Sequence, residues 1–286
     1  MRFSLDLPSP FRFQEILTFH GRDTARLAED CDPSRIRKGF LLHGVPVEIT
    51  IALEGAQGKC RVKADSPLPA AVRQQMPHIA AGLLGLNHDV SVFEKIARKD
   101  SLMGALVKRQ LGLRIPQTAT PFEALTWAII GQQINLTFAV TLRRTLIQLA
   151  GRPHSSGLWC YPDAEAVSRL KVEDLASQKF SRAKAETLIR VAELTKAEKL
   201  ILRADRSPAE MEESLLGIKG VGPWTVNYVL LRGLSCPDCS LHGDAGVKAA
   251  LRRLTGTAPS TDEAHGILER YRPHRSWAAA HLWASL

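Results

Sequence analysis

The sequence predicts an α+β fold in which a small domain with an antiparallel sheet precedes an all-α core. Apolar and polar residues alternate within roughly the first 65 positions, which is typical of half-buried strands. After about residue 90 the apolar residues take up helical spacing, and clear helix starts appear. We therefore divide the chain of 286 residues into an N-terminal α+β domain, residues 1–90, and a helical core, residues 91–286.

Strands and helices are expected to interleave in the N-terminal domain. The alternating segments are Phe3–Leu7, Val47–Ile51 and Cys60–Val62. Residues 54–58 contain two glycines and predict a hairpin loop between the last two strands. Helical patterns around Glu15–Phe19 and over Pro69–Ala81 complete a domain in which helices accompany an antiparallel sheet.

Several helices of the core begin with the same capping pattern. A Ser or Thr followed three residues later by Glu lets the hydroxyl accept from a backbone N–H, while the carboxylate reaches back to the cap. The pattern occurs at Thr120–Glu123, Ser207–Glu210 and Ser260–Glu263, and the first two have Pro directly after the cap. These helix starts predict a multi-helix domain.

Charge and composition narrow the classes of function. The chain carries 38 Lys and Arg against 29 Asp and Glu, and its net charge of +9 favours a polyanionic partner such as nucleic acid. No apolar run reaches the ~18 residues of a membrane span, and the first residues do not resemble a secretory signal. Five cysteines do not suggest a disulfide framework, so we expect a reducing cytoplasm.

The most informative stretch is Leu215–Gly233, where two glycines separate a pair of expected helices. Gly220 and Gly222 flank one apolar residue, and glycine lets the backbone adopt positive φ and approach another surface closely. We expect Val221 to turn inward, and the N–H groups at the start of the second helix to face a phosphate. This is the pattern of a helix-hairpin-helix that holds the DNA backbone. An ordinary turn between two helices is the alternative.

Downstream of the hairpin, Asp244 opens a further helix. A hairpin, a loop and an aspartate in this order resemble the helix-hairpin-helix-GPD superfamily of DNA glycosylases, most closely the bacterial AlkA-type 3-methyladenine DNA glycosylase II. The segments 120–146 and 269–283 are also similar to this family. The resemblance implies a core of two helical subdomains with the active site in the cleft between them. It also implies hydrolysis of the N-glycosidic bond of flipped alkylated purines in duplex DNA, which leaves an abasic site.

Asp244 matches the essential aspartate of this family. Cleavage of an N-glycosidic bond builds positive charge on the deoxyribose, and a fixed carboxylate stabilises that charge. The same group can orient or deprotonate the attacking water. Two alternatives stay open, because Asp244 also suits a helix N-cap and Asp238 is a nearby carboxylate that fits a turn after Pro237.

The resemblance places aromatic side chains around the flipped base. Trp224 and Tyr228 are four residues apart and share a helix face, and Phe19 and Trp283 match further pocket positions. Electron-rich rings attract a cationic alkylated purine, although packing in the core is the alternative. Lyase-competent relatives have a nucleophilic lysine where this chain has Trp224, which implies monofunctional hydrolysis. Ala245 replaces an aromatic residue of the family, so the pocket is expected to be wider or less selective for cations.

The remaining expected DNA contacts lie in a loop and in the hairpin. Gln132 and Gln133 resemble the family loop that enters DNA, and Gln133 matches the side chain that fills the gap left by the flipped base. A kink between two helices is the alternative. Backbone and phosphate contacts are expected from Lys219, Gly220, Val221, Gly222, Thr225, Lys248 and Arg252.

No cofactor is expected. Cys236 and Cys239 form a CxxC without a second pair, so neither a metal site nor an iron–sulfur cluster is predicted. The resemblance implies only that carbonyls of the hairpin can hold a monovalent cation. The expected partner is double-stranded DNA containing alkylated bases, bound by a monomer in the bacterial cytosol. The rival functions are a non-catalytic helix-hairpin-helix protein that recognises damaged or bent DNA, and a bifunctional glycosylase with lyase activity.

Overall fold

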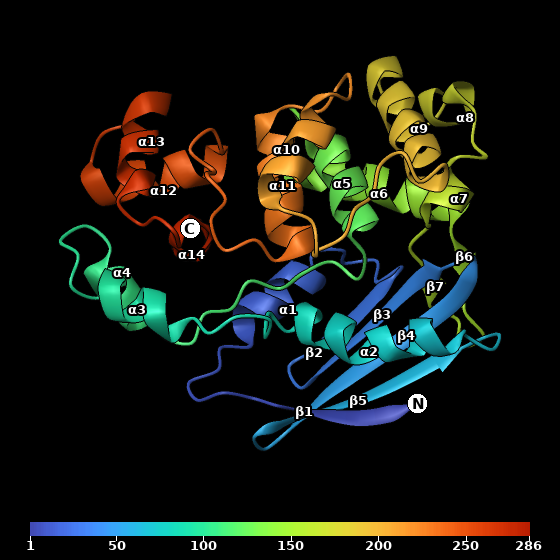
Figure 1. Ribbon diagram of the computed structural model, residues 1–286, viewed down its shortest axis with the longest axis horizontal. Coiled ribbons are helices and arrows are strands. Elements are labelled where there is room, and N and C mark those ends of the chain that lie inside the picture. The colour runs from blue at the N-terminus through green and yellow to red at the C-terminus, as the bar shows by residue number, and fades with distance from the viewer.

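A five-stranded antiparallel sheet lies beside two groups of helices in the computed structural model, which describes residues 1–286 (Figure 1). The strands are β1 Arg2–Asp6, β2 Glu29–Asp32, β3 Arg35–Leu42, β4 Val45–Glu54 and β5 Gln57–Ala64. Their order in the sheet is β1-β5-β4-β3-β2. The helices that accompany the sheet are α1 Gln14–His20 and α2 Ala70–Leu83. The predicted α+β class is confirmed.

The rest of the chain is almost entirely helical. Its helices are α3 Ser91–Ala97, α4 Gly104–Arg109, α5 Pro121–Gly131, α6 Leu136–Ala150, α7 Ala164–Val167, α8 Val172–Ala176, α9 Arg182–Lys196, α10 Pro208–Leu216, α11 Pro223–Leu234, α12 Ala245–Thr255, α13 Thr261–Glu269 and α14 Arg275–Trp283. None of the helices has the length and apolarity that a membrane span requires.

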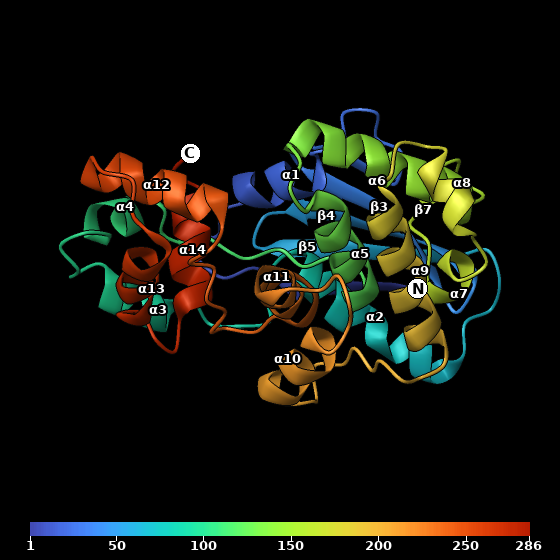
Figure 2. The same cartoon turned by 90° about the horizontal axis from the view of Figure 1, so that it is seen from above.

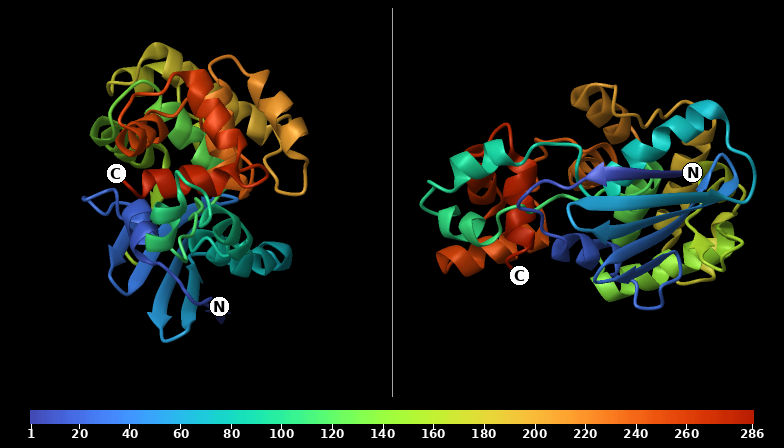
Figure 3. Two further views of the ribbon diagram at one scale, coloured as in Figure 1. Left: turned by 90° about the vertical axis from the view of Figure 1, so that its left-hand side faces the viewer. Right: turned by 90° about the horizontal axis from the view of Figure 1, so that it is seen from below.

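The helices form two lobes. One lobe contains α5 to α11, and the other joins α12 to α14 with α3 and α4 from earlier in the chain, as Figures 1 and 3 both show. The ring of Phe93 in α3 contacts the rings of Tyr271, Trp277 and His281 and so ties this second lobe together. Seen from above, α11 lies between the second lobe and α5 (Figure 2). The proposed boundary at residue 90 stays a prediction.

The helical part also contains a pair of very short strands that the sequence analysis does not anticipate. They are β6 Arg152–Pro153 and β7 Trp159–Cys160. Directly after β7, Tyr161 forms a parallel bridge with Phe40 of β3. This contact attaches the helical part to the sheet.

The sequence pattern does not predict β2 and β3, because charged residues lie within both strands. Glu29 of β2 and Lys38 of β3 are buried together with Glu123 of α5 and Arg143 of α6. Lys38 Nζ lies 2.6 Å from a Glu29 carboxylate oxygen and 2.7 Å from one of Glu123. Arg143 pairs with the same two carboxylates. Because the charges cancel within the cluster, charged residues occupy an interior that joins the sheet to the first helical lobe.

The three predicted helix starts are confirmed, with one difference in detail. Ser207 and Ser260 form complete capping boxes with Glu210 and Glu263. Thr120 accepts from the Glu123 N–H as expected. The Glu123 carboxylate, however, does not reach the cap N–H. It accepts instead from the Ala119 N–H at 3.1 Å and pairs with the buried cations, which offer a stronger partner.

Candidate active site

The hairpin between α10 and α11 has the predicted geometry at Gly220 but not at Gly222. Gly220 has a φ of +95°, and a Cβ there would lie 2.2 Å from Thr187 Oγ1, so only glycine fits. Gly222 has a φ of −111° and a ψ of 176°, which any residue adopts. The expectation of positive φ is therefore wrong for Gly222. A Cβ at Gly222 would meet no atom within 4 Å, so its absence leaves the outer surface open.

Polar side chains from neighbouring elements brace the hairpin. Gln132 Nε2 donates to Gly220 O at 3.0 Å and to Thr225 Oγ1 at 2.9 Å. Arg190 Nη1 donates to Lys219 O at 3.2 Å. The carbonyls of Gly220 and Lys219 thus accept side-chain donors, and the monovalent cation expected at the hairpin carbonyls stays a prediction. The predicted hairpin residues and Gln132 are brought together, with Val221 buried and the Lys219 side chain exposed.

The start of α11 presents backbone donors that the protein itself does not use. Gly222 is the N-cap and receives no side-chain cap. The N–H groups of Gly222, Trp224 and Thr225 have no acceptor within the chain. Free N–H groups at a helix N-terminus, together with the exposed Lys219, form a site suited to a phosphate.

Asp244 combines both of the roles that the sequence left open. It is the N-cap of α12, and its Oδ1 accepts from the Val247 N–H at 2.9 Å. The indole N–H of Trp283 also donates to Oδ1 at 2.8 Å, and that of Trp224 donates to Oδ2 at 2.8 Å. Three donors from three helices thus hold a half-buried carboxylate in one orientation. Asp238 is occupied elsewhere, in an ion pair with Arg275.

The predicted aromatic residues also gather near this carboxylate. The rings of Trp224 and Tyr228 lie on one face of α11 with their centroids 5.4 Å apart. Trp283 comes from α14, and its indole shares Asp244 with Trp224. Phe19 comes from α1, and its ring lies against the guanidinium of an arginine that also lies over the Trp283 ring. Trp224, Phe19 and Trp283 are half-buried, so they border a surface rather than a closed core.

That arginine is Arg232. The sequence analysis did not predict Arg232 or a second arginine, Arg22, as residues of this cluster. The Arg232 Cζ lies 4.4 Å from the centroid of the Phe19 ring and 5.3 Å from that of Trp283. Burial lowers the pKa of Arg232 to about 10, and the guanidinium remains charged at neutral pH. A usable signal existed in the sequence, because Arg232 follows Trp224 and Tyr228 at helical spacing on α11.

The loop between α5 and α6 carries the predicted gap-filling residue. Gln133 is exposed and has a φ of +55°, which is uncommon for a residue with a side chain. Asn135 then caps α6 by accepting from the Phe138 N–H. Neighbouring Gln132 is tied to the hairpin, so Gln133 projects from a braced loop. Strained backbone of this kind tends to be kept where it serves a function.

Lys248 and Ala245 lie on α12 beyond Asp244. Lys248 Nζ donates to Thr261 Oγ1 at 2.7 Å and makes no hydrogen bond to the hairpin. Arg252, one turn further along α12, is exposed. Ala245 is exposed as well and leaves no aromatic ring directly after the aspartate.

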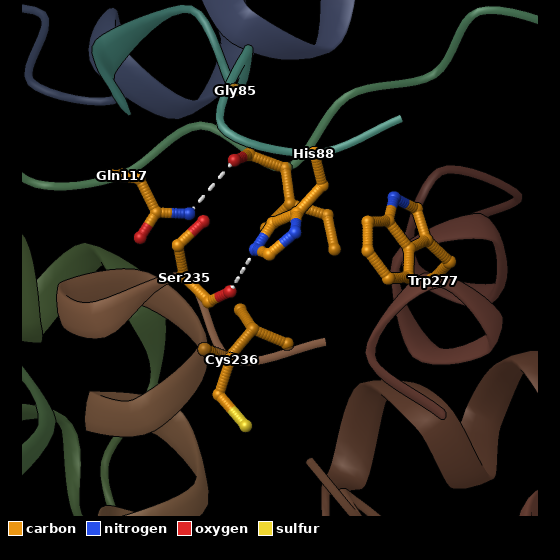
Figure 4. A pocket seen from close by; sticks show the side chains of 8 residues that line it. Gly85, His88, Gln117, Ser235, Cys236 and Trp277 are labelled. Atoms are coloured by element: carbon orange, nitrogen blue, oxygen red, sulfur yellow. Dashed lines mark hydrogen bonds between the residues drawn. The ribbon is translucent and has the colours of Figure 1, made fainter. Parts of the chain in front are cut away.

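A separate small pocket lies between the lobes and shares no residue with this site (Figure 4). His88 bonds there with Ser235 O, and Trp277 and Cys236 form part of its wall. Cys236 and its neighbour Cys239 are free thiols. No group of three or more His, Cys, Asp or Glu side chains in the structure is placed to hold a metal ion.

Fold and site together define a helix-hairpin-helix protein with a fixed carboxylate beside an aromatic cluster. Residues 126–273 match the HhH-GPD superfamily of base excision DNA repair proteins. A DNA-3-methyladenine glycosylase of Bacillus subtilis is 32% identical over 210 residues, which span 70% of this chain and 69% of that protein. DNA-3-methyladenine glycosylase 2 of Escherichia coli is 28% identical over 183 residues, 63% of each chain.

The solved structures show the same fold. The 3-methyladenine DNA glycosylase from Archaeoglobus fulgidus superposes with a TM-score of 0.83 at 22% identity, covering 98% of this chain and 97% of that one. The chain therefore belongs to the HhH-GPD superfamily.

Proposed function

We propose that this protein is a monofunctional DNA glycosylase that hydrolyses the N-glycosidic bond of alkylated purines in duplex DNA. The observation that carries the proposal is the Asp244 carboxylate, which two indoles and a helix N-terminus hold beside an aromatic cluster. Backbone binding alone requires neither the carboxylate nor the aromatic rings. Relatives named DNA-3-methyladenine glycosylase support the same class of reaction.

DNA binding is assigned to the hairpin and the α5–α6 loop. The free N–H groups at the start of α11 and the Lys219 ammonium bind a phosphate near the damaged nucleotide. The target base leaves the stack, and Gln133 fills the gap, which offsets part of the unstacking cost of a few kcal/mol. The amide of Gln133 can pair with the base that is left opposite.

The chemical step is assigned to Asp244. The bond between C1′ and the base nitrogen breaks, and its electron pair leaves with the base. The negative carboxylate stabilises the positive charge that develops on the sugar. Water then adds its oxygen to C1′ and gives up a proton, for which Asp244 is the proposed acceptor. The rings of Trp224, Tyr228, Phe19 and Trp283 surround the leaving base.

Monofunctional hydrolysis follows from the residue at position 224. A lyase of this family forms a Schiff base between a lysine amine and C1′, and the Trp224 indole cannot do so. We propose that the product is an abasic site in an unbroken strand, made by a monomer without a cofactor.

The test uses duplex DNA that contains a single 7-methylguanine, with the released material analysed by mass spectrometry. We expect free 7-methylguanine and a strand that breaks only after alkali treatment. A covalent protein–DNA adduct trapped by borohydride would instead favour the lyase. Tight binding without release of base would favour the non-catalytic alternative.

A further inference from the structure

Two cysteines lie three residues apart in the turn that follows α11 and leads to α12. Cys236 and Cys239 are separated by Pro237 and Asp238, and both are free thiols. The Cys239 side chain folds back over the turn, and its thiol donates to Cys236 O at 3.7 Å. The glycosylase function proposed above uses neither thiol.

A single hydroxyl group of α14 holds both ends of this turn. Ser276 Oγ donates to Cys236 O at 2.7 Å and accepts from the Cys239 N–H at 2.9 Å. The Ser276 N–H also donates to Pro237 O at 3.2 Å. Ser276 is fully buried, so water does not compete for these bonds. The backbone therefore keeps the two cysteines close together before any bond forms between them.

An ion pair with α14 holds the middle of the same turn. Arg275 Nε donates to Asp238 Oδ1 at 2.7 Å, and Nη2 donates to Oδ2 at 2.9 Å. Nη2 also donates to the Asp238 carbonyl at 3.1 Å. A two-point pair of this kind fixes orientation as well as distance. Because the turn is already fixed, a bond between its two thiols costs little further conformational entropy.

The two thiols differ in acidity and in access. The Cys239 thiol hydrogen-bonds with that of Cys236, and this bond, aided by the Asp238 N–H, lowers the pKa of Cys236 below that of an ordinary thiol. Burial raises the pKa of Cys239. Cys239 is buried, whereas Cys236 is partly exposed and forms part of the wall of the pocket between the lobes (Figure 4). Cys236 is thus the thiol suited to react as a thiolate, and Cys239 the one that keeps its proton.

The other three cysteines lack this combination. Burial raises the pKa of Cys31, Cys60 and Cys160. Cys60 and Cys160 are also buried, but Cys31 is partly exposed, as Cys236 is. Cys31 therefore serves as an internal comparison, because its exposure is similar and its acidity is not.

We propose that Cys236 and Cys239 are a site of reversible oxidation, at which a hydroperoxide oxidises Cys236 and Cys239 then closes an intramolecular disulfide. The disulfide protects the turn from irreversible oxidation of Cys236 to sulfinic acid. This chemistry does not require base release, so the inference is independent of the proposed glycosylase function.

The reaction has two steps. The Cys236 thiolate attacks one oxygen of the hydroperoxide, the O–O bond breaks, and hydroxide leaves with the electron pair. The sulfur is oxidised to a sulfenic acid, and the peroxide is reduced. The Cys239 sulfur then attacks the Cys236 sulfur, the S–S bond forms as the S–O bond breaks, and the leaving hydroxide takes the Cys239 proton to give water. A dithiol reductant reverses the process by thiol–disulfide exchange.

The protection matters because the turn holds α14 in place. Further oxidation of Cys236 would create an anionic sulfinate close to the Asp238 carboxylate and in competition for Arg275. Helix α14 also carries Trp283, whose indole donates to Asp244. Loss of the contacts at the start of α14 would therefore destabilise a helix that contributes to the candidate active site.

The experiment maps the thiols of the intact protein after exposure to excess hydrogen peroxide. The protein is then denatured with N-ethylmaleimide, which labels the remaining thiols, and its peptides are analysed by mass spectrometry. The wild type is compared with Cys239→Ser, and Cys31→Ser is the matched control. A second set of samples is treated with dithiothreitol before labelling.

We expect the wild-type peptide that contains Cys236 and Cys239 to lose both labels together with two hydrogen atoms, and to regain both labels after dithiothreitol. Cys236 should be consumed at least about tenfold faster than Cys31, since only the thiolate reacts. Cys31→Ser should behave as the wild type does. Cys239→Ser should instead accumulate sulfinic acid at Cys236 that dithiothreitol does not reverse.

Three results would overturn the inference. They are a wild type whose Cys236 stays labelled, equal consumption of Cys31 and Cys236, and full recovery of Cys236 by dithiothreitol in Cys239→Ser. The melting temperature supplies a second readout, in which each protein is compared with its own untreated sample. Peroxide should leave that of the wild type nearly unchanged and lower that of Cys239→Ser, whereas equal shifts in both would contradict a protective role.

Discussion

Asp244 shows how one side chain can meet a structural and a chemical demand together. Its Oδ1 caps α12 through the Val247 N–H, and the indoles of Trp224 and Trp283 orient the same carboxylate toward the aromatic cluster. The cap was predictable because it is a local pattern. The two indole bonds join residues 20 and 39 positions away, which no local pattern can reveal.

Gln133 yields a prediction at the same scale. Its φ of +55° costs about 1 kcal/mol in a residue with a side chain, and glycine would relieve that strain. Glycine also adds a similar amount of entropy to the unfolded chain. Gln133→Gly should therefore change the free energy of unfolding by less than about 1 kcal/mol, yet slow single-turnover base release, because nothing fills the gap. Unchanged release from this variant would remove Gln133 from the proposed mechanism.

The aromatic residues of the site could be predicted from the sequence, but its two arginines could not. Trp224, Tyr228, Phe19 and Trp283 were expected, and the structure brings them into one cluster. Arg22 and Arg232 were not among the expected site residues. The contact of Arg232 with Phe19 arises only when α1 and the end of α11 meet in the folded chain, and Arg22, three residues after Phe19, meets Trp127 of α5 only there as well.

At the scale of elements, the two glycines of the hairpin allow strain and surface access to be tested separately. Gly220→Ala should destabilise the protein by about 1–3 kcal/mol, because a positive φ and a clash with Thr187 must both be accommodated. Gly222→Ala should fold with nearly normal stability, since its Cβ meets open space. It should still weaken binding of an abasic duplex, because the methyl group stands where a phosphate would approach. Denaturant titration and equilibrium binding measure the two effects. Normal DNA affinity of Gly222→Ala would contradict the assigned phosphate site.

Helix boundaries were predictable where their determinants are local. The caps at Thr120, Ser207 and Ser260 lie within three residues of their partners, and all three helices start where expected. Strands β2 and β3 were missed, because their buried charges are neutralised by Glu123 and Arg143 on distant helices. Long-range pairing thus overrode the local alternation of apolar and polar residues that otherwise marks a strand.

A buried histidine of helix α14, His281, should make the free energy of unfolding depend on pH. Burial lowers the pKa of His281 to about 3, and its ring bonds with Gln110 Oε1. In the unfolded chain this histidine has a pKa near 6.5 and binds a proton below that pH. In the folded protein His281 stays neutral down to a pH of about 3. As pH falls from about 6.5 to 3, this residue alone should lower the free energy of unfolding by about 1.4 kcal/mol per pH unit.

The measurement is a series of denaturant titrations across that pH range. His281→Gln should show a slope smaller by about one proton, since the amide can still bond with Gln110. The exposed His78 supplies the control, and His78→Gln should follow the wild type. Identical slopes for the wild type and His281→Gln would show that the buried ring is not neutral.

For the whole molecule, one continuous set of buried apolar side chains extends from Ile16 in α1 to Leu282 in α14. Buried ion pairs among Glu29, Lys38, Glu123 and Arg143 also connect the sheet to the first helical lobe. These connections set the position of α1 relative to α11. The N-terminal part of the chain therefore contributes to the site, through Phe19 of α1 and Arg22 of the loop that follows α1.

The net charge of +9 makes a prediction at this scale. Binding of undamaged duplex DNA should weaken steeply with salt, since each neutralised phosphate releases counterions. Lys219→Ala should reduce the slope of log K against log salt by about one. The control is Lys59→Ala, which removes an exposed charge from β5 in the sheet and should leave the slope unchanged. Equal slopes for Lys219→Ala and the wild type would remove Lys219 from the phosphate site.

The most direct test of the proposed mechanism is the single-turnover rate of base release from a duplex containing 7-methylguanine, compared between the wild type and Asp244→Asn. Asparagine is as good an N-cap as aspartate, but its NH2 group cannot accept from the Trp224 indole as Asp244 Oδ2 does, so the melting temperature and the affinity for DNA are measured beside the rate. Without the negative charge, release should slow by at least about a hundredfold, in keeping with the loss of electrostatic stabilisation at an active site. Equal rates for the two proteins, with folding and binding intact, would contradict the assignment of Asp244 to the reaction.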